Sequence, residues 1–397
     1  MKAWILSEIG KIEYTDVQRP IPEPGETLIK VRAAGICGSD VPRTYKTGAH
    51  KMPIIIGHEF SGVVEETGER VGIFPLIPCK ECGPCRSGHY EMCRHYDYIG
   101  SRRDGAFAEY VAVPEENLIK LPDEVSFEEA AMLEPMAVAV HAMRRGLSLI
   151  AGERHDTVFG NKADAYSASG FSAGVDKDIN ICVCGLGTIG MLLIEFLFEA
   201  GFHNIYAIGR RDAQKERFAA TARRFLNGWV NEHYCDSHQN DPVEWIKKVT
   251  DVREGCDLFF ECVGTNESIN YAIEGSASGG NVVLVGNPAS DITFPRDAYW
   301  KILRNQLRIT GTWNSSFDLE RENQRVPEAG MCDTGSGGMD SVAMDDWQYV
   351  IERLRIHSVH PSDLISHRLR MDELDKGLEI MRDKSEDYCK VMLTAEC

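Results

Sequence analysis

The sequence lacks any long hydrophobic run. No window reaches the roughly 18 consecutive apolar residues that a membrane-spanning helix needs. The start of the chain, MKAWILSEIG, contains one Lys and no apolar stretch of signal-peptide length. We therefore expect no transmembrane helix and no secretory signal, and we assign the protein to the cytoplasm.

Positive charge is also scarce. The chain has 43 Lys and Arg against 61 Asp and Glu, which gives a formal net charge of −18. Nucleic acids and anionic membranes are bound by clustered Lys and Arg that replace counterions, so the composition excludes both partners. Two local basic pairs, Arg102–Arg103 and Arg210–Arg211, stand out against this acidic background.

The chain has 397 residues, of which 43% are hydrophobic and 26% charged. This composition is typical of a globular protein, and the length predicts two or three domains. No internal repeat is visible. Short apolar runs broken by Pro and Gly over residues 1–31 predict β-strands with turns.

Cysteine is plentiful, with 13 residues, but a reducing compartment argues against a disulfide framework. Four of them cluster in IPCKECGPCRSGHYEMC, as Cys79, Cys82, Cys85 and Cys93. Four thiolates complete a tetrahedral zinc site, so the spacing predicts a structural zinc ion. A redox pair, reactive thiols and an iron–sulfur cluster are the alternatives.

A second metal site is predicted in GICGSDVPRTYKTGAHKMPIIIGHEF. Cys37, His58 and Glu59 offer a thiolate, an imidazole and a carboxylate, which suit zinc, and Glu134 from LEPMAVAVHA could complete or modulate the set. A catalytic zinc uses about three protein ligands and keeps one position open. The alternative is that Cys37 and His58 are separate core residues, because spacing alone is weak evidence.

A dinucleotide-binding turn is predicted in INICVCGLGTIGMLLIEFLFEAG. A buried strand, the motif Gly185-x-Gly187-x-x-Gly190 and an apolar helix follow one another, as the binding of a pyrophosphate at a helix N-terminus requires. Further strand–helix alternation, including CDLFFECVG and GNVVLVGNP, predicts a parallel sheet. The candidate cofactor-binding residues are Gly185, Gly187, Thr188, Ile189, Gly190, Gly209, Arg210, Arg211, Val263, Gly264, Val285, Gly286 and Asn287.

The tip of the second strand, NIYAIG, favours NADP over NAD. It ends at Gly209, where an acidic residue would hydrogen-bond the adenosine ribose, and Arg210 and Arg211 follow. Space and positive charge suit a 2′-phosphate. The alternative is that both Arg are exposed and the protein binds NAD. Two stretches, 151–178 and 319–343, are rich in Gly and polar residues and are interpreted as surface insertions.

Taken together, ICGSD, GHEFSG, the four-Cys segment, LEP and GLGTIG resemble, in that order, the zinc-containing medium-chain alcohol and polyol dehydrogenases. The resemblance implies an α/β protein with a GroES-like β-rich catalytic domain, residues 1–141 and 315–397, which carries the structural zinc lobe 79–93. A Rossmann domain, residues 142–314, lies between these segments in the chain. It also implies two zinc ions per chain, NAD(P), and a homodimer or homotetramer.

By position, Cys37, His58 and Glu134 resemble the family's catalytic zinc ligands, with Glu59 as an alternative ligand. Ser39 resembles the hydroxyl that relays the alcohol proton, while the hydride goes to the nicotinamide. Asp40 matches a carboxylate that would orient His58.

GAHKMPIIIGHEFSG and YDYIGSRRDGAFAEY are similar to the branch that oxidises a polyol phosphate, such as galactitol 1-phosphate, to the ketose phosphate. The candidate phosphate ligands are Arg43, Lys46, Arg102 and Arg103, although the last two could be solvated loop cations. The alternatives are a dehydrogenase of sorbitol, xylitol, butanediol or threonine, and a non-catalytic dinucleotide-binding protein.

Overall fold

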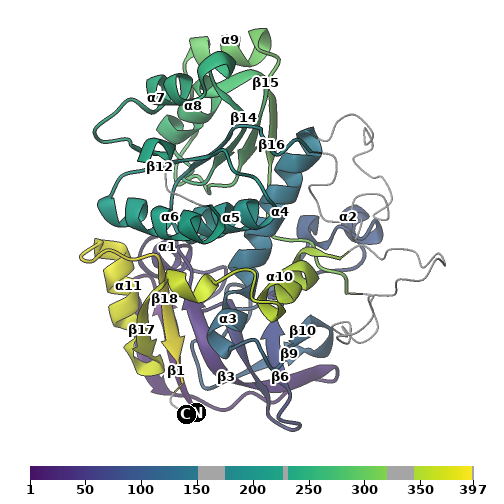
Figure 1. Ribbon diagram of the computed structural model, residues 1–397. Coiled ribbons are helices and arrows are strands. Elements are labelled where there is room, and N and C mark those ends of the chain that lie inside the picture. Colours follow the sequence, from purple (N-terminus) through teal and green to yellow (C-terminus); the bar gives the residue numbers. More distant parts are fainter. Residues whose placement is uncertain (151–174, 227–230, 320–343, 396–397) are drawn as a thin grey trace, which may run out of the picture. The chain divides into compact units, whose positions relative to one another are not determined.

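The computed structural model describes residues 1–150, 175–226, 231–319 and 344–395 (Figure 1). Within these ranges the chain divides into two compact units, the first made of residues 1–137, 315–319 and 345–395 and the second of residues 138–314 and Met344. The proposed insertions 151–178 and 319–343 lie almost wholly outside the described residues. Among the described helices, none is long and apolar enough to cross a membrane.

The first unit is built on sheets whose strands pair antiparallel, except for the parallel pair β17–β18. The largest has the order β10-β6-β5-β3-β18-β17, with β9 also paired to β3. Smaller sheets have the orders β2-β1-β4 and β7-β8. The bounds are β1 Lys2–Glu8, β2 Lys11–Asp16, β3 Glu26–Ile36, β4 Ile54–Ile55, β5 Glu59–Val64, β6 Arg70–Ile73, β7 Leu76–Ile77, β8 Asp97–Tyr98, β9 Tyr110–Pro114, β10 Leu118–Lys120, β17 Ile365–Arg370 and β18 Lys390–Thr394.

The end of the chain completes this sheet, because β18 pairs antiparallel with β3. Trp4 donates its indole N–H to the Met371 carbonyl at 2.7 Å and so joins the two ends of the chain inside one core. The helical segments of this unit include α1 Asp40–Pro42, η1 Arg43–Thr47, α2 Gly83–Arg86, α3 Phe127–Ala131, α10 Asp346–Arg355 and α11 Leu374–Asp383. Ser126 and Glu129 form a capping box at the start of α3. Helix α4, Leu133–Ile150, contains the boundary between the units.

The second unit is a six-stranded parallel sheet with the order β13-β12-β11-β14-β15-β16. Helices α5 and α6 cover one face, and α7, α8 and α9 cover the other (Figure 1). The strands are β11 Ile181–Cys184, β12 Ile205–Gly209, β13 Tyr234–Asp236, β14 Cys256–Glu261, β15 Ser276–Leu284 and β16 Arg308–Gly311. The helices are α5 Thr188–Glu199, α6 Asp212–Phe225, α7 Pro242–Val249, α8 Asn266–Glu274 and α9 Arg296–Arg304.

The strand order reverses between β11 and β14, and ligands of such sheets bind at the carboxyl ends of the strands on either side of the reversal. The glycine motif lies there. Gly185 follows β11 with φ +99°, a left-handed conformation that glycine adopts without strain. A Cβ at Gly190 would overlap the Gly185 carbonyl, so this glycine permits the tight turn into α5.

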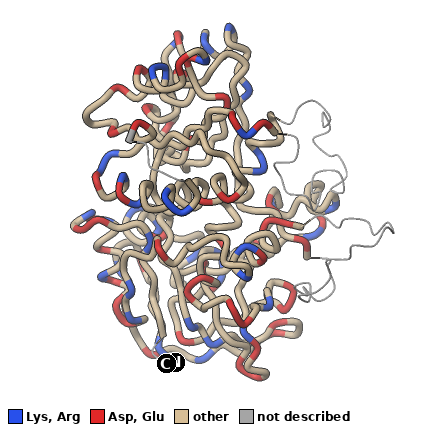
Figure 2. The backbone as a smooth tube through the Cα atoms, viewed as in Figure 1, with Lys and Arg blue, Asp and Glu red and all other residues tan. Residues whose placement is uncertain are grey.

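Charge is mixed in both units. Figure 2 shows Asp and Glu interspersed with Lys and Arg along the described chain. The positive groups considered for the site are therefore local features, and each has to be judged by the acidic residues around it.

Candidate active site and metal centres

The four clustered cysteines converge on one point. Sulfur–sulfur distances are 3.4 Å for Cys82–Cys85, 3.5 Å for Cys79–Cys93, and 4.0 Å for both Cys79–Cys85 and Cys82–Cys93. Ligands placed tetrahedrally at the Zn–S distance of about 2.3 Å would be about 3.8 Å apart. All four thiols are free of disulfides, so the donor set and its spacing fit one zinc ion.

The backbone around this cluster favours thiolates. The N–H groups of Arg94 and Cys85 lower the pKa of Cys82 to about 6, and the N–H of Glu81 is the main cause that lowers the pKa of Cys79. Such N–H···S contacts stabilise negative sulfur, which is the form that binds a metal. The short helix α2 begins beside Cys82 and carries Cys85 in its single turn.

A second group brings together Cys37, His58 and Glu59. One ligand atom from each lies within 4.8 Å of the other two, and His58 and Glu59 are buried. Burial is the main cause that lowers the pKa of His58, so its imidazole is neutral and able to bind a metal. His58 Nδ1 is buried without a hydrogen-bond partner in the described structure. This orphaned nitrogen beside a thiol and a carboxylate fits a dication.

Asp40 acts differently from the expectation. Its carboxylate accepts the Cys37 N–H at 3.0 Å and pairs with Arg43 at 2.5 Å, whereas His58 Nδ1 is 3.7 Å away and is not hydrogen-bonded to it. The Asp40 carboxylate therefore fixes the Cys37 backbone. Ser39 donates its hydroxyl to Cys37 Sγ at 3.2 Å, which places the proposed relay group beside the first metal ligand.

Glu134 lies near the same group. It accepts a hydrogen bond from the Tyr98 hydroxyl at 3.2 Å, and the Tyr98 ring packs edge-on to His58 with centroids 5.7 Å apart. Burial raises the pKa of Glu134, while nearby His58 opposes that shift. Its carboxylate is not within the 4.8 Å that unites Cys37, His58 and Glu59. Glu134 is therefore adjacent to the cluster, held by Tyr98.

Lys390 was missed by the sequence analysis. Its ammonium forms a fully buried ion pair with Glu59 and also donates to the Ile36 carbonyl at 3.2 Å. A Cβ at Gly35 would overlap both partners, so this glycine makes room for the pair. Burial lowers the pKa of Lys390 to about 8. The only sequence signal was a Lys inside the otherwise apolar strand CKVMLTA.

The pairing assigns Glu59 a role distinct from that of Cys37 and His58. A carboxylate that is already paired with a buried ammonium is less available as a direct metal ligand, because the ammonium neutralises its negative charge. Cys37 and His58, with Glu134 close by, therefore remain the more available donors.

Two of the four basic candidates border this group. Arg102 stacks over the Tyr96 ring at 4.6 Å, and Tyr96 packs edge-on to Tyr98 with centroids 6.1 Å apart. Its Nε is buried without a hydrogen-bond partner in the described structure. Partial burial, and then the charges of Arg102 and Arg43, lower the pKa of His50. Arg43 and Arg102 are therefore each close enough to His50 for their charges to act on it, and the sequence analysis missed His50.

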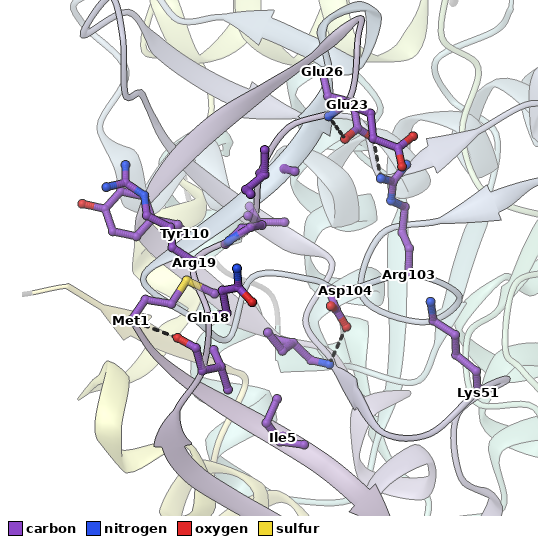
Figure 3. A pocket seen from close by; sticks show the side chains of 16 residues that line it. Met1, Ile5, Gln18, Arg19, Glu23, Glu26, Lys51, Arg103, Asp104 and Tyr110 are labelled. Carbon is purple, nitrogen blue, oxygen red and sulfur yellow. Dashed lines mark hydrogen bonds and ion pairs between the residues drawn. The ribbon is translucent and has the colours of Figure 1, made fainter.

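The other two candidates lie elsewhere. Arg103 forms an ion pair with Glu26, beside Asp104 and Lys51, in a separate pocket of about 510 Å³ (Figure 3). None of the residues that line this pocket belongs to the Cys37 group. Lys46 is exposed at the end of η1.

The predicted cofactor residues of the second unit converge on the glycine turn. A Cβ at Gly185 would come within 2.6 Å of the Val263 side chain, and one at Gly264 would meet the backbone of Gly286 and Asn287. Val285 follows β15, and its N–H donates to the Glu261 carbonyl at 2.8 Å.

Glu261, which the sequence analysis did not identify, fixes the turn after β14. Its buried carboxylate accepts the N–H groups of Val263 at 2.7 Å and Gly264 at 2.8 Å. A Glu at the end of the apolar strand CDLFFE was the available signal.

The tip of β12 has no room for an acidic side chain. A Cβ at Gly209 would lie 2.6 Å from the Tyr234 hydroxyl and 3.1 Å from Gln214 Oε1. The Tyr234 hydroxyl donates to the Arg211 carbonyl at 3.0 Å, and Gln214 accepts the Arg210 N–H at 2.8 Å. Arg210 and Arg211 thus connect the end of β12 to the start of α6 at the carboxyl edge of the sheet, and Arg211 is the N-cap residue of that helix.

Family models identify the class of protein. Residues 23–123 match the alcohol dehydrogenase GroES-like domain, and residues 188–329 match the zinc-binding dehydrogenase model. The chain belongs to the zinc-binding medium-chain alcohol dehydrogenase family, whose members are zinc- and NAD(P)-dependent enzymes acting on alcohols and polyols. The predicted α/β fold, a GroES-like domain plus a Rossmann-type parallel sheet, is confirmed. The four thiols form a structural zinc site, and the Cys37 group is the candidate catalytic site.

Among characterised relatives, the chain is 31% identical over 323 residues to galactitol 1-phosphate 5-dehydrogenase of Escherichia coli K12, covering 79% of this chain and 83% of the relative. It is 30% identical over 310 residues to L-idonate 5-dehydrogenase of Vitis vinifera, covering 74% and 75%. The crystal structure of galactitol-1-phosphate dehydrogenase from E. coli superposes with TM-score 0.77 at 27% identity, covering 99% of this chain and all of the other.

A zinc-binding dehydrogenase from Sinorhizobium meliloti 1021, solved with NADP, shares the fold with TM-score 0.76 at 24% identity, covering 99% and 98%.

Proposed function

We propose that the protein oxidises a secondary alcohol of a polyol phosphate to the ketose phosphate with NAD(P). The observation that carries this proposal is the basic group Arg43, His50 and Arg102, which borders the Cys37–His58 group within one unit. The similarity to galactitol 1-phosphate 5-dehydrogenase supports the same substrate class.

In this proposal Cys37, His58 and Glu134 hold the catalytic zinc, and Glu59, paired with the buried Lys390, lies beside these ligands. Zinc bound there would supply Lewis acidity that favours loss of the alcohol proton. Ser39, hydrogen-bonded to Cys37 Sγ, accepts this proton and passes it outward. Arg43 and Arg102 bind the substrate phosphate by charge-assisted hydrogen bonds.

The cofactor is assigned to the glycine turn of the second unit, with a lean toward NADP. The preference for NADP rests on two features. Tyr234 and Gln214 leave no room for an acidic side chain at Gly209, and Arg210 and Arg211 beside it are positively charged. Helix α5 begins at Thr188 and presents its first N–H groups at the turn for a pyrophosphate.

Replacing Arg102 by Ala should raise KM for a hexitol phosphate about 10- to 100-fold and leave KM for the free hexitol within about twofold, because only the phosphate loses a charge-assisted contact. The measurement is steady-state oxidation of both substrates. Arg103→Ala is the matched control, since Arg103 pairs with Glu26 outside the group, and it should change neither value. Equal losses on both substrates in the Arg102→Ala enzyme would remove the phosphate assignment.

A dehydrogenase of unphosphorylated polyols is the second candidate. It is favoured by Asp40, whose carboxylate already neutralises Arg43, and by the relatives L-idonate 5-dehydrogenase and D-xylulose reductase A of Aspergillus niger, which is 29% identical over 311 residues. Assays of hexitol phosphates, hexitols, xylitol, butanediol and threonine with NAD and NADP in parallel would separate the candidates.

We further infer a homodimer or homotetramer. Strand β16 is the last of the six, and among the described strands only β15 pairs with it. Exposed edge strands are normally covered. Exposed large apolar side chains lie on β16, just after it and on the preceding helix α9, namely Ile309, Trp313, Tyr299, Trp300 and Leu303. Sedimentation at micromolar concentration should give the mass of two or four chains of 44.3 kDa, and a monomer of 44.3 kDa would contradict the inference.

A further inference from the structure

The β12 tip lacks an acidic side chain, but a carboxylate reaches it from another element. Glu267, in the first turn of α8, lies 3.4 Å from the Arg210 guanidinium. The Tyr271 hydroxyl, one turn further along α8, donates to Glu267 at 2.5 Å and holds the carboxylate in place. The Arg210 N–H is fixed by Gln214, so both partners of the ion pair are restrained at their bases.

This pair lies at the cofactor edge of the sheet. Cys184 is the last residue of β11 and directly precedes Gly185. Burial raises the pKa of the Cys184 thiol, and among the nearby charges Arg210 opposes the shift while Glu267 adds to it. Arg210 and Glu267 are therefore both close to the carboxyl end of β11, where the glycine turn begins.

We propose that Glu267 selects between NAD and NADP. It provides, from α8, the carboxylate that Gly209 cannot provide from β12, and it neutralises Arg210, the cation that would bind a 2′-phosphate. A ribose diol would donate to Glu267 without penalty, because the carboxylate is an acceptor. A 2′-phosphate could bind Arg210 only by breaking the Arg210–Glu267 ion pair, and it would then lie beside the negative charge of Glu267.

This inference rests on the proposed placement of the cofactor at the glycine turn, and it makes a separate claim about specificity. The Gly209–Arg210–Arg211 segment favours NADP, and Glu267 moderates that preference, so the native chain keeps affinity for NAD. Both partners are about half exposed, so the effect of their pairing is a modest factor in affinity.

The test is the binding of NADH and NADPH to the full-length protein, followed by nicotinamide fluorescence without substrate. In Glu267→Gln we expect Kd for NADPH to fall about threefold and Kd for NADH to rise about threefold, which shifts their ratio about tenfold. Adding Arg210→Gln should abolish the gain for NADPH, because the freed cation is then absent.

Glu274→Gln is the matched control. Glu274 ends the same helix, loses the same charge, and lies 3.8 Å from Lys301 rather than near Arg210. In Glu274→Gln the ratio of Kd for NADH to Kd for NADPH should equal that of the native protein. An unchanged ratio in Glu267→Gln, or an equal shift in Glu274→Gln, would overturn the selector role while leaving the cofactor site intact. Failure of the native protein to bind either dinucleotide would overturn the cofactor site itself.

Discussion

Replacing Cys37 by Ser should lower the zinc content from two ions per chain to one and reduce kcat/KM by about 10³-fold or more, since the lost Lewis acid accounts for several kcal/mol of the barrier. Cys37 is the only thiol of the Cys37–His58–Glu59 group, and a hydroxyl is a poor replacement for a thiolate on zinc. The measurements are metal analysis of the purified protein and initial rates with a polyol phosphate.

Two further variants identify which ion is lost. Cys85→Ser should also leave one zinc per chain, because it removes a ligand of the four-thiolate site, and the double variant should bind none. Cys235→Ser is the control, because Cys235 is a buried thiol of β13 outside both groups, and two ions and native activity are expected. Two ions and native rates in Cys37→Ser would refute the catalytic assignment of this group.

Local spacing was enough to predict the elements that depend on neighbours in the sequence. The four cysteines lie within one short segment, and their spacing correctly predicted that they converge. The capping box of Ser126 and Glu129 is equally local, because hydrogen bonds between residues three positions apart close it. The strand–glycine–helix turn is carried by a motif of six consecutive residues, Gly185–Gly190. The family resemblance supplied the order of the domains.

The sequence could not predict which distant residue each charged side chain contacts. Glu59 was considered as a metal ligand, yet its closest cation, Lys390, is 331 residues away and reaches it only because β18 pairs with β3. Arg102 and Arg103 are adjacent in sequence, but one stacks on Tyr96 and the other binds Glu26, 77 residues away. A charged side chain carries no local signal of which opposite charge the fold will bring to it.

The electrostatic character of the site follows from these distant pairings. Arg103 is removed from the candidate phosphate group by Glu26, while His50 joins it through its proximity to Arg43 and Arg102. At the cofactor edge, Glu267 similarly reduces the net positive charge at Arg210, because the two side chains form an ion pair. Arg102, Arg103 and Arg210 were identified from the sequence, but the partners that determine their local charge were found only in the tertiary structure.

Lys390→Met should destabilise the first unit by about 3–5 kcal/mol, because it leaves the Glu59 carboxylate buried without a counter-charge. The side chains of Lys390 and Glu59 are only 2% and 3% exposed, and the space for them is provided by Gly35. Urea unfolding followed by tryptophan fluorescence measures the loss. The double variant Glu59→Leu/Lys390→Met should recover most of it, since an apolar pair can replace a buried ion pair at little cost.

Lys376→Met is the matched control for this prediction. Lys376 pairs with Glu373 on the surface of α11 at 2.5 Å and is 62% exposed, so its loss should cost no more than about 1 kcal/mol. A Lys390→Met protein as stable as Lys376→Met would show that the Glu59 charge is balanced by another group, and the bound zinc would then be the candidate. In that case Glu59 would rejoin Cys37 and His58 as a direct ligand, and removing zinc from Lys390→Met should lower its stability far more than removing zinc from the native protein.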